Sequence, residues 1–381
     1  MDDRLSHHNP HWIDTDRAVL DLLNVLGGQS LVAVDTESDS LYSYYEKVCL
    51  LQFSIPGVDY LVDPLAANIK PLGDLFASGN VQKIFHAAEY DILSLKRDYG
   101  FEFANLFDTM VAARVVGWPQ YGLGHLLNER FGVQPDKRFQ RYNWGLRPLS
   151  QEALIYARLD THYLHALREI LLAELTAQNR VREASEAFQR LTQLEPSPRS
   201  FDPDGFWRIK GARRISPTAQ AVLQALYIFR DKQARRSDRP PFKILTDSTL
   251  MHLARAQPQS PNELARVKGV SATHIRRFGQ ALLKVIREGQ EASPPDYPRS
   301  RAPRPHNSTL RRYEALRRWR NQIASRRGVE PDVILLNNTL KAIAEEVPVS
   351  LKELDALELL GEWQLETYGQ AILQVLRKTS T

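Results

Sequence analysis

The sequence predicts an α/β domain with a mixed sheet, followed by two small all-α domains. Three observations lead to this fold class. Short apolar runs alternate with helical patterns in the first half of the chain. The second half repeats itself at an offset of 90 residues. Proline-rich stretches at 195–205 and 291–307 have the composition of linkers.

The first half contains runs typical of strands and of helices. The expected strands are short runs rich in apolar and β-branched residues, at 31–35, 48–54, 59–63 and 81–85. The expected helices follow a 3.6-residue apolar period, at 87–99, 109–116, 122–131 and 151–177. Strands come first and helices are interleaved later, which favours a mixed sheet covered by helices.

The repeat in the second half needs no gap. ALYIFRDKQARR (225–236) aligns with ALRRWRNQIASR (315–326), and FGQALLKVIR (278–287) aligns with YGQAILQVLR (368–377). A period near 90 is too long for a solenoid, so we expect two tandem domains of four or five short helices each.

These patterns predict five segments. They are the α/β domain at 1–195, a linker at 196–214, the first helical domain at 215–290, a Pro/Arg-rich linker at 291–307 and the second helical domain at 308–381.

The composition excludes several classes of protein. The single cysteine, Cys49, lies in an apolar run, so no disulfide framework and no thiol metal site are expected. No apolar stretch approaches the roughly 18 residues of a membrane span. The start, MDDRLSHHNPHW, is unlike a signal peptide, and we expect a cytoplasmic protein without a membrane partner.

The net charge of +5 hides an asymmetry. Residues 1–195 carry 18 basic and 26 acidic side chains, a net of −8, whereas residues 215–290 carry 13 and 5, a net of +8. Residues 308–381 are near neutral, with 11 against 10. An acidic unit tethered to a basic one suggests a polyanionic partner; the alternative is a basic face that serves only solubility.

Four acidic residues stand where core residues would fit. Asp35 and Glu37 continue the face of the strand that begins at Leu31. Asp91 lies on the apolar side of the helix after the strand at 81–85, and Asp160 lies on the apolar stripe of a later helix. Singly, each has an ordinary explanation as a strand-end residue, a first-turn helix charge or a hydrogen-bonded core polar residue.

Together, the four acids indicate a metal site. Like charges gathered away from water repel each other unless they are protonated or neutralised by cations. Oxygen ligands without cysteine suit Mg²⁺ or Mn²⁺, and two such ions about 4 Å apart promote displacement at phosphorus. Tyr156 lies one helical turn before Asp160 and could orient the attacking water; the alternative is an ordinary core aromatic residue.

The motifs DTE (35–37), HAAEYD (86–91) and YARLD (156–160) resemble those of the DEDD exonuclease superfamily, DxE, Nx₃(F/Y)D and Yx₃D, with the tyrosine of the DEDDy branch. The neighbouring LKRDYG (95–100) and NLFDT (105–109) resemble the ribonuclease D group. The 90-residue repeats are similar to HRDC domains. One departure is His86, which stands where the superfamily pattern has asparagine and is expected to be a positioning or structural residue.

The resemblance implies a ribonuclease H-like exonuclease domain followed by two HRDC-like domains. It implies that Asp35, Glu37, Asp91 and Asp160 hold two divalent metal ions, Mg²⁺ or Mn²⁺, and that Tyr156 orients the water. The implied reaction releases nucleoside 5′-monophosphates from the 3′ end of RNA. Transfer-RNA precursors and other small structured RNAs are the expected substrates, and a monomer is expected.

The first repeat carries the expected RNA contacts. They are Arg230, Lys232, Arg235, Arg236, Lys243, Lys268, Arg276 and Arg277. The second repeat has Glu345, Glu358 and Glu366 at the positions of Arg255, Lys268 and Arg276. It is therefore expected to bind RNA more weakly or to pack against the exonuclease domain.

Other readings remain open at this point. The same metal chemistry would cut DNA, and an inactive exonuclease fold could serve only to bind nucleic acid, although all four acids and the tyrosine are present. A helicase is excluded because no GxxxxGK[ST] phosphate loop occurs. His7, His8 and His11 could suggest a transition-metal site, but near a terminus they are more often solvated.

Overall fold

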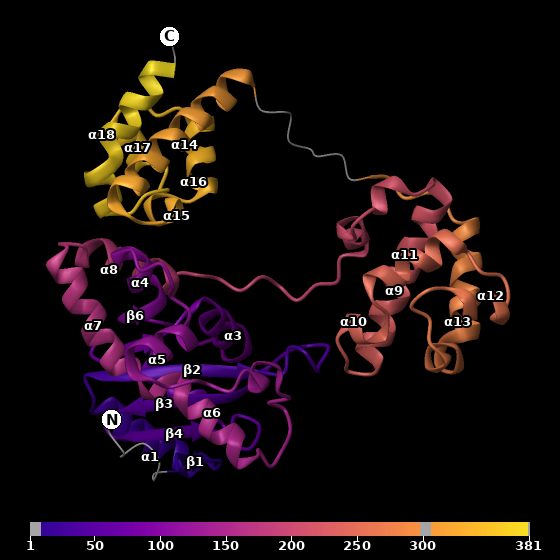
Figure 1. Ribbon diagram of the computed structural model, residues 1–381, viewed down its shortest axis with the longest axis horizontal. Helices are drawn as coiled ribbons and strands as arrows, with labels where there is room; N and C mark the ends of the chain where they lie inside the picture. Colours follow the sequence, from indigo (N-terminus) through magenta and orange to yellow (C-terminus); the bar gives the residue numbers. More distant parts are fainter. Residues whose placement is uncertain (1–8, 298–305, 380–381) are drawn as a thin grey trace. The chain divides into compact units, whose positions relative to one another are not determined.

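The computed structural model of the protein describes residues 9–297 and 306–379. The chain forms two compact units. One contains Met1–Ser38, Val48–Pro196 and Arg304–Thr381, and the other contains Asp39–Lys47 and Ser197–Pro303. The first unit therefore joins the α/β domain to the second helical repeat, and the second unit is built on the first repeat (Figure 1).

A six-stranded mixed sheet forms the centre of the α/β domain, in the order β1-β4-β3-β2-β5-β6. Its strands are β1 (His11–Ile13), β2 (Leu31–Ser38), β3 (Val48–Ile55), β4 (Val58–Val62), β5 (Gln82–Phe85) and β6 (Leu106–Asp108). β2 runs antiparallel to β3 and parallel to β5. The ends of β2 and β5 consequently lie at the same edge of the sheet.

Eight helices belong to the α/β domain. They are α1 (Asp16–Gly27), α2 (Gly73–Ala77), α3 (Glu89–Tyr99), α4 (Thr109–Val116), α5 (Leu123–Phe131), α6 (Gln151–His162), α7 (Leu164–Ala177) and α8 (Val181–Thr192). α6 packs on β2, β3 and β4, and α7 packs on β2 and β5. β3 is covered on both faces, which explains why its residues are apolar almost without alternation.

The expected strands and helices are present, with three kinds of difference. The helix expected at 151–177 is divided into α6 and α7 at Tyr163. β1 and β6 were not expected, because three residues are too few to show an alternating pattern. α1 and α8 were also not expected. Cys49 is fully buried, as its apolar surroundings predicted.

The second repeat folds into five helices that pack on the α/β domain within the same unit. They are α14 (Asn307–Arg327), α15 (Pro331–Ile334), α16 (Asn337–Glu346), α17 (Leu351–Asp355) and α18 (Glu362–Thr379). Arg327 donates to the buried carboxylate of Glu183 on α8, at 2.5 Å. Arg114 on α4 donates to Glu330 and Asp332 at 2.9 and 2.7 Å. One of the two expectations for this repeat, packing on the exonuclease domain, is thus confirmed.

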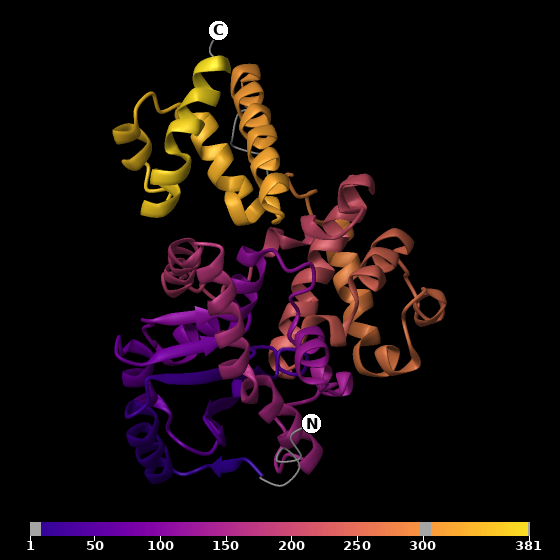
Figure 2. The same ribbon diagram turned by 60° about the vertical axis from the view of Figure 1, so that its left-hand side comes forward.

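The first repeat also has five helices, so the four or five expected for each repeat are confirmed (Figure 2). They are α9 (Pro217–Arg236), α10 (Pro241–Ile244), α11 (Asp247–Ala256), α12 (Pro261–Arg266) and α13 (Ala272–Glu291). Its core contains Leu226, Leu250 and Leu282, all of them fully buried.

The β2–β3 loop, residues 39–47, belongs to the same unit as the first repeat. The Tyr44 hydroxyl donates to Asp231 at 2.5 Å, and the Tyr44 backbone N–H donates to Asp238 at 3.0 Å. The Lys243 ammonium lies 3.7 Å from the centre of the Tyr42 ring. This loop lies inside the range expected for the α/β domain, so the contact units do not coincide with that range.

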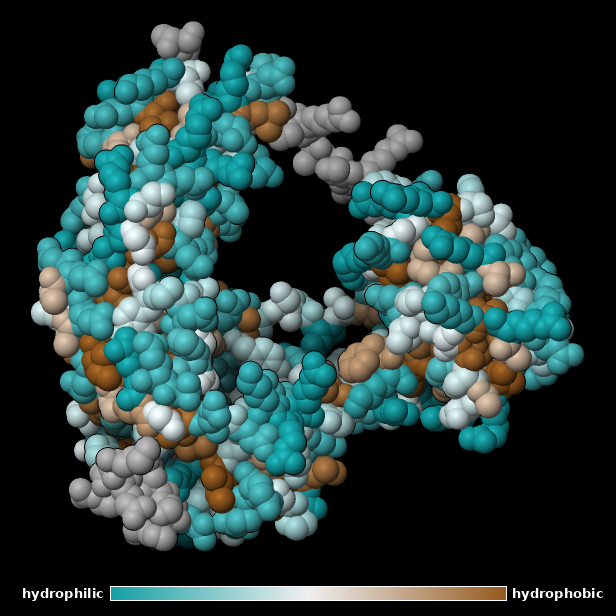
Figure 3. Space-filling model, viewed as in Figure 1, coloured by the Kyte–Doolittle hydropathy of each residue, from teal (hydrophilic) through white to brown (hydrophobic). Residues whose placement is uncertain are grey.

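The exposed surface is mostly hydrophilic, with small separate apolar patches (Figure 3). Across the part of the chain that the structure describes, no helix is both long and apolar enough to cross a membrane.

Candidate active site

Asp35, Glu37 and Asp91 come from adjacent elements at one edge of the sheet. Asp35 and Glu37 lie two residues apart near the end of β2, on the same side of the strand. Asp91 lies in the first turn of α3, which follows the parallel neighbour β5. The Thr36 hydroxyl donates to Asp91 Oδ1 at 2.5 Å, which ties the start of α3 to β2.

Tyr156 and Asp160 come from α6, one helical turn apart. Tyr156 is buried in an aromatic cluster, with ring centres 5.3 Å from Phe139 and 6.1 Å from Trp144. α6 begins at Ser150, whose side chain accepts the Ala153 N–H and caps the helix. The helix therefore presents its tyrosine and its acid along one face toward the sheet.

A buried polar network fixes α6 against the sheet. Arg158 and His162 of α6 both reach Asp59 on β4, at 3.3 and 2.8 Å. Asp59 also accepts a hydrogen bond from Ser54 on β3 at 2.6 Å. Because all these groups are buried or half-buried, their bonds resist any sliding of α6 along the sheet.

The turn before α3 is held in a conformation that non-glycine residues adopt with difficulty. Ala87 has a φ of +63°, in the left-handed region. The buried carboxylate of Asp108 accepts the N–H groups of Ala87 and Ala88 at 3.2 and 2.7 Å. Asp108 also accepts two N–H groups at the start of α4. One acid thus fixes the turn that aims Asp91 into the site.

His86 lies in the same turn and is a neutral, structural residue. The Thr109 hydroxyl donates to the Phe85 carbonyl, so it accepts from His86 Nδ1 at 2.9 Å. Burial lowers the pKa of His86 to about 4, which keeps the ring uncharged at neutral pH. This agrees with the expectation that His86 positions the turn.

The four acids raise each other's pKa values. Burial raises the pKa of Asp91 to about 7, against the opposing hydrogen bond from Thr36. Burial and the charge of Asp91 raise the pKa of Asp160 to about 7. Burial, and then the charges of the other three acids, raise the pKa of Asp35 well above its ordinary value. Burial and the charges of Asp160 and Asp91 do the same for Glu37. The site thus brings the four acids within electrostatic reach of each other.

The Tyr156 hydroxyl stays protonated. Burial raises its pKa, and the charges of Asp160, Glu37 and Asp35 raise it further. A phenol surrounded by carboxylates acts as a hydrogen-bond donor at neutral pH and not as a base.

The donor set fits divalent cations that prefer oxygen. Four carboxylates face each other in a partly desolvated site, and no basic side chain contributes to the pKa of any of them. Gln52, opposite Asp35 on β3, donates from Nε2 to Asp35 at 3.4 Å, while its buried Oε1 has no hydrogen-bond partner. Within residues 9–297 and 306–379, however, no three acidic or histidine side chains are already gathered as an ion-binding group.

The N-terminal histidines add no support for a separate metal site. His7 and His8 lie outside the described residues. The His11 ring, on β1, packs on Tyr60 with ring centres 5.4 Å apart.

The expected RNA contacts divide into exposed and engaged residues. The exposed ones are Lys232, Arg236, Lys268, Arg276 and Arg277. Arg235 is also exposed but donates to the Tyr44 hydroxyl at 3.5 Å, and Lys243 covers the Tyr42 ring. Arg230 is a correction: it is buried and donates to the Leu245 carbonyl and to Asp247. Arg320 makes the equivalent bonds in the second repeat, so this arginine is structural.

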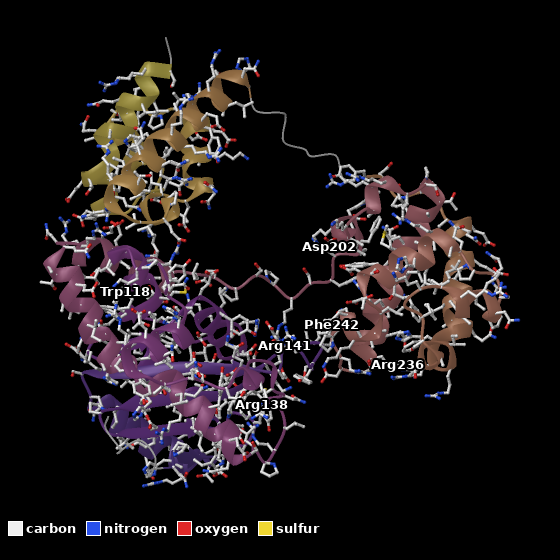
Figure 4. The ribbon with its side chains drawn as sticks, in the orientation of Figure 1. Trp118, Arg138, Arg141, Asp202, Arg236 and Phe242 are labelled. Atoms are coloured by element: carbon white, nitrogen blue, oxygen red, sulfur yellow. The ribbon has the colours of Figure 1, made fainter. Side chains whose placement is uncertain are left out.

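A basic segment beside Tyr156 was not expected to be functional. The short helix at Lys137–Arg141 places Phe139 against Tyr156, while Lys137, Arg138 and Arg141 are exposed. Figure 4 shows Arg138 and Arg141 on this segment. The run KRFQR, shortly before the YARLD motif, was the available signal. Gln52 and Asp108 were missed because single polar residues in strands have no distinctive spacing.

Comparisons with known proteins agree with this site. A 3′–5′ exonuclease family model matches residues 10–176, and an HRDC domain model matches 219–286 and 309–376. Ribonuclease D of Acidiphilium cryptum is 30% identical over 382 residues, covering 97% of this chain and 94% of the relative. Exosome complex exonuclease RRP6 of Saccharomyces cerevisiae is 30% identical over 295 residues, but the match spans 40% of the yeast protein.

Solved structures show the same fold. The catalytic core of RRP6 from Trypanosoma brucei has a TM-score of 0.66 and 26% identity, and the match covers 75% of this chain and 84% of that one. Escherichia coli RNase D has a TM-score of 0.65 and 23% identity over 97% of this chain and 99% of that one, a likeness of fold. The chain belongs to the ribonuclease D family and is a hydrolytic 3′–5′ exoribonuclease.

Proposed function

We propose that Asp35, Glu37, Asp91 and Asp160 hold two divalent ions, Mg²⁺ or Mn²⁺, and that the enzyme releases nucleoside 5′-monophosphates from RNA. The observation that carries this proposal is the mutual elevation of the four pKa values without a basic partner. Such ions, when bound, stabilise charge on the phosphoryl oxygens and lower the pKa of a bound water. Because the four acids are not already gathered as an ion-binding group, ion binding includes drawing them together.

The protein's own groups divide the remaining work. The Tyr156 hydroxyl lies in the reach of the Asp160, Glu37 and Asp35 charges and remains protonated, so it can donate to and orient the attacking water. The aromatic cluster around Tyr156 prevents its ring from turning away. Gln52 holds Asp35 by a side-chain bond across the β2–β3 pair.

RNA affinity is supplied outside this acidic centre. The exposed cations of the first helical repeat, Lys232, Arg235, Arg236, Lys268, Arg276 and Arg277, together with Lys243, are proposed to contact phosphates, whereas Arg230 is not. We also propose contacts from Lys137 and Arg141, since their segment packs on Tyr156. Transfer-RNA precursors and other small structured RNAs are the proposed substrates, by resemblance to the family.

The proposal includes the organisation of the chain. The boundaries 1–195, 215–290 and 308–381 are supported by the positions of the family matches and of the helices. We propose a cytoplasmic monomer, because the site takes all its residues from one chain.

A 3′-tailed transfer-RNA transcript tests the proposal. The transcript is incubated with enzyme in Mg²⁺, in Mn²⁺ and in EDTA, beside a DNA oligomer of the same sequence, and products are identified by mass. We expect stepwise 5′-mononucleotides from RNA with metal and none in EDTA. The Asp35→Asn variant should be inactive, whereas Glu89→Gln, an exposed acid on the same helix as Asp91, should remain active. Activity in EDTA, or full activity of Asp35→Asn, would contradict the metal assignment.

A further inference from the structure

A basic pocket lies in the first helical repeat, between the end of α11 and the turn after α12. Its volume is about 470 Å³, and its lining consists of His252, Arg255, Ala256, Pro258, Glu263, Arg266, Val267 and Lys268. Pro258 and Val267 are buried and form an apolar floor, while Arg255, Arg266 and Lys268 are exposed. Three cations thus surround a hollow that contains one acid.

The cations of this pocket are available to a ligand. Among the described residues, Arg255 and Lys268 form no ion pair. The acid is already engaged, because the Glu263 carboxylate accepts the Gln259 N–H at 3.0 Å and the Ser260 hydroxyl at 3.1 Å. These bonds cap α12 and lower the pKa of Glu263. The pocket therefore has a net positive charge that no neighbouring acid cancels.

The second repeat shows that the helical fold does not need these cations. Its capping acid is retained, since Glu353 accepts the Val349 N–H and the Ser350 hydroxyl at 3.0 and 3.2 Å. At the positions of Arg255 and Lys268, however, it has Glu345 and Glu358. It also replaces Arg266 with alanine and Ala256 with glutamate. One scaffold thus carries opposite charges at the same place, so the charge serves something other than folding.

The turn that carries Lys268 is held in place from inside the repeat. His252 donates from Nδ1 to the Lys268 carbonyl at 3.0 Å. The Arg255 guanidinium lies beside Gly211, in a segment that also contains the exposed Lys210 and Arg213. Positive charge therefore continues from the pocket along this segment, as a track for a polyanion would require.

We propose that this pocket binds a phosphodiester of the RNA strand upstream of the 3′ end that is being cut. Arg255 and Arg266 offer planar guanidinium groups that match phosphate oxygens, and Lys268 offers a mobile ammonium. The pocket makes the first repeat the RNA-holding copy, whereas the second repeat packs on the α/β domain. This inference rests on the proposed function, because it assumes an RNA substrate.

The test is a double charge reversal, Arg255→Glu with Lys268→Glu, in the full-length protein. Binding of a fluorescein-labelled 30-nucleotide single-stranded RNA is measured by anisotropy in EDTA, at several KCl concentrations. We expect affinity to fall about 10-fold or more at low salt. The slope of log K against log[KCl] should become shallower by about 1.4, from about 0.7 for each lost phosphate contact on a single strand.

Arg287→Glu is the matched control. Arg287 is exposed on α13 of the same repeat, outside the pocket, and the second repeat keeps an arginine there, Arg377. It should leave affinity and slope nearly unchanged. An equal loss in the control, or no loss in the double variant, would overturn the pocket assignment.

Two further measurements complete the design. Hydrolysis of a trinucleotide with Mn²⁺ should be unchanged in the double variant, since so short a substrate does not extend beyond the active site. Failure of the unmodified enzyme on this substrate would instead refute the proposed function, which separates the two ideas. The single variant Arg255→Glu, which copies the helical Glu345, should show about half the change in slope with an unchanged melting temperature.

Discussion

Replacing Asp160 with asparagine should make the metal-free enzyme more stable and make it unresponsive to metal. Asp160 is buried, and burial together with the Asp91 charge raises its pKa to about 7. A carboxyl group with a raised pKa binds its proton more tightly in the folded protein than in the unfolded chain. The stability associated with that proton is present below pH about 4 and is lost as the pH rises through about 7.

The size of the effect follows from the two pKa values. The difference between about 7 in the folded protein and the ordinary value of 3.8 corresponds to about 4 kcal/mol above pH 7. Asparagine has nearly the same shape and does not ionise, so it removes this penalty. For a unit of this size, about 4 kcal/mol raises the melting temperature by roughly 10 °C.

The assay is thermal unfolding in EDTA at pH 5.5 and pH 8, with and without Mn²⁺. Unmodified protein in EDTA should melt at a lower temperature at pH 8 than at pH 5.5, and Mn²⁺ should restore stability at pH 8. Asp160→Asn should melt higher than the unmodified protein at pH 8 in EDTA and gain little from Mn²⁺. Glu89→Gln, an exposed acid on α3, is the control and should behave like the unmodified protein. An Asp160→Asn variant with unmodified stability in EDTA at pH 8 would refute the account of the site as an assembly of mutually repelling acids.

Three further predictions concern groups around the site and the interface. Tyr156→Phe should lower turnover by orders of magnitude while RNA and Mn²⁺ binding stay nearly intact; an equal loss of both would show that the tyrosine is structural. Gln52→Leu removes the bond to Asp35 and should weaken Mn²⁺ binding several-fold by calorimetry, and unchanged affinity would count against a positioning role. Arg327→Ala leaves the buried Glu183 unpaired and should cost about 3 kcal/mol in denaturant unfolding. Adding Glu183→Gln should recover much of that loss, and a loss that persists in the double variant would assign the effect to packing.

The acidic centre was readable from sequence because each acid interrupts an apolar pattern. Asp35 and Glu37 extend the face of a strand, and Asp160 interrupts a helical stripe whose other members are buried. The parallel pairing of β2 and β5, which brings Asp91 to the same edge, follows from the fold class.

Other features depend on contacts between segments far apart in the chain. Arg230 has the composition of an RNA contact, but its burial and its bond to Asp247 come from the packing of α9 on α11. The division of the expected helix at Tyr163 has no glycine or proline signal. The association of residues 39–47 with the first repeat depends on bonds to Asp231 and Asp238, nearly 200 positions later in the sequence.

The two repeats use the same corner of their helical fold for different attachments. In the second repeat, Glu330 and Asp332, just after α14, receive Arg114 of the α/β domain. In the first repeat, the corresponding corner after α9 receives the β2–β3 loop through Asp238. That loop begins one residue after β2, the strand of Asp35 and Glu37. Tension on the first repeat during RNA transit would therefore be transmitted to the catalytic strand through a very short tether, and the reaction rate would become sensitive to pulling on the strand.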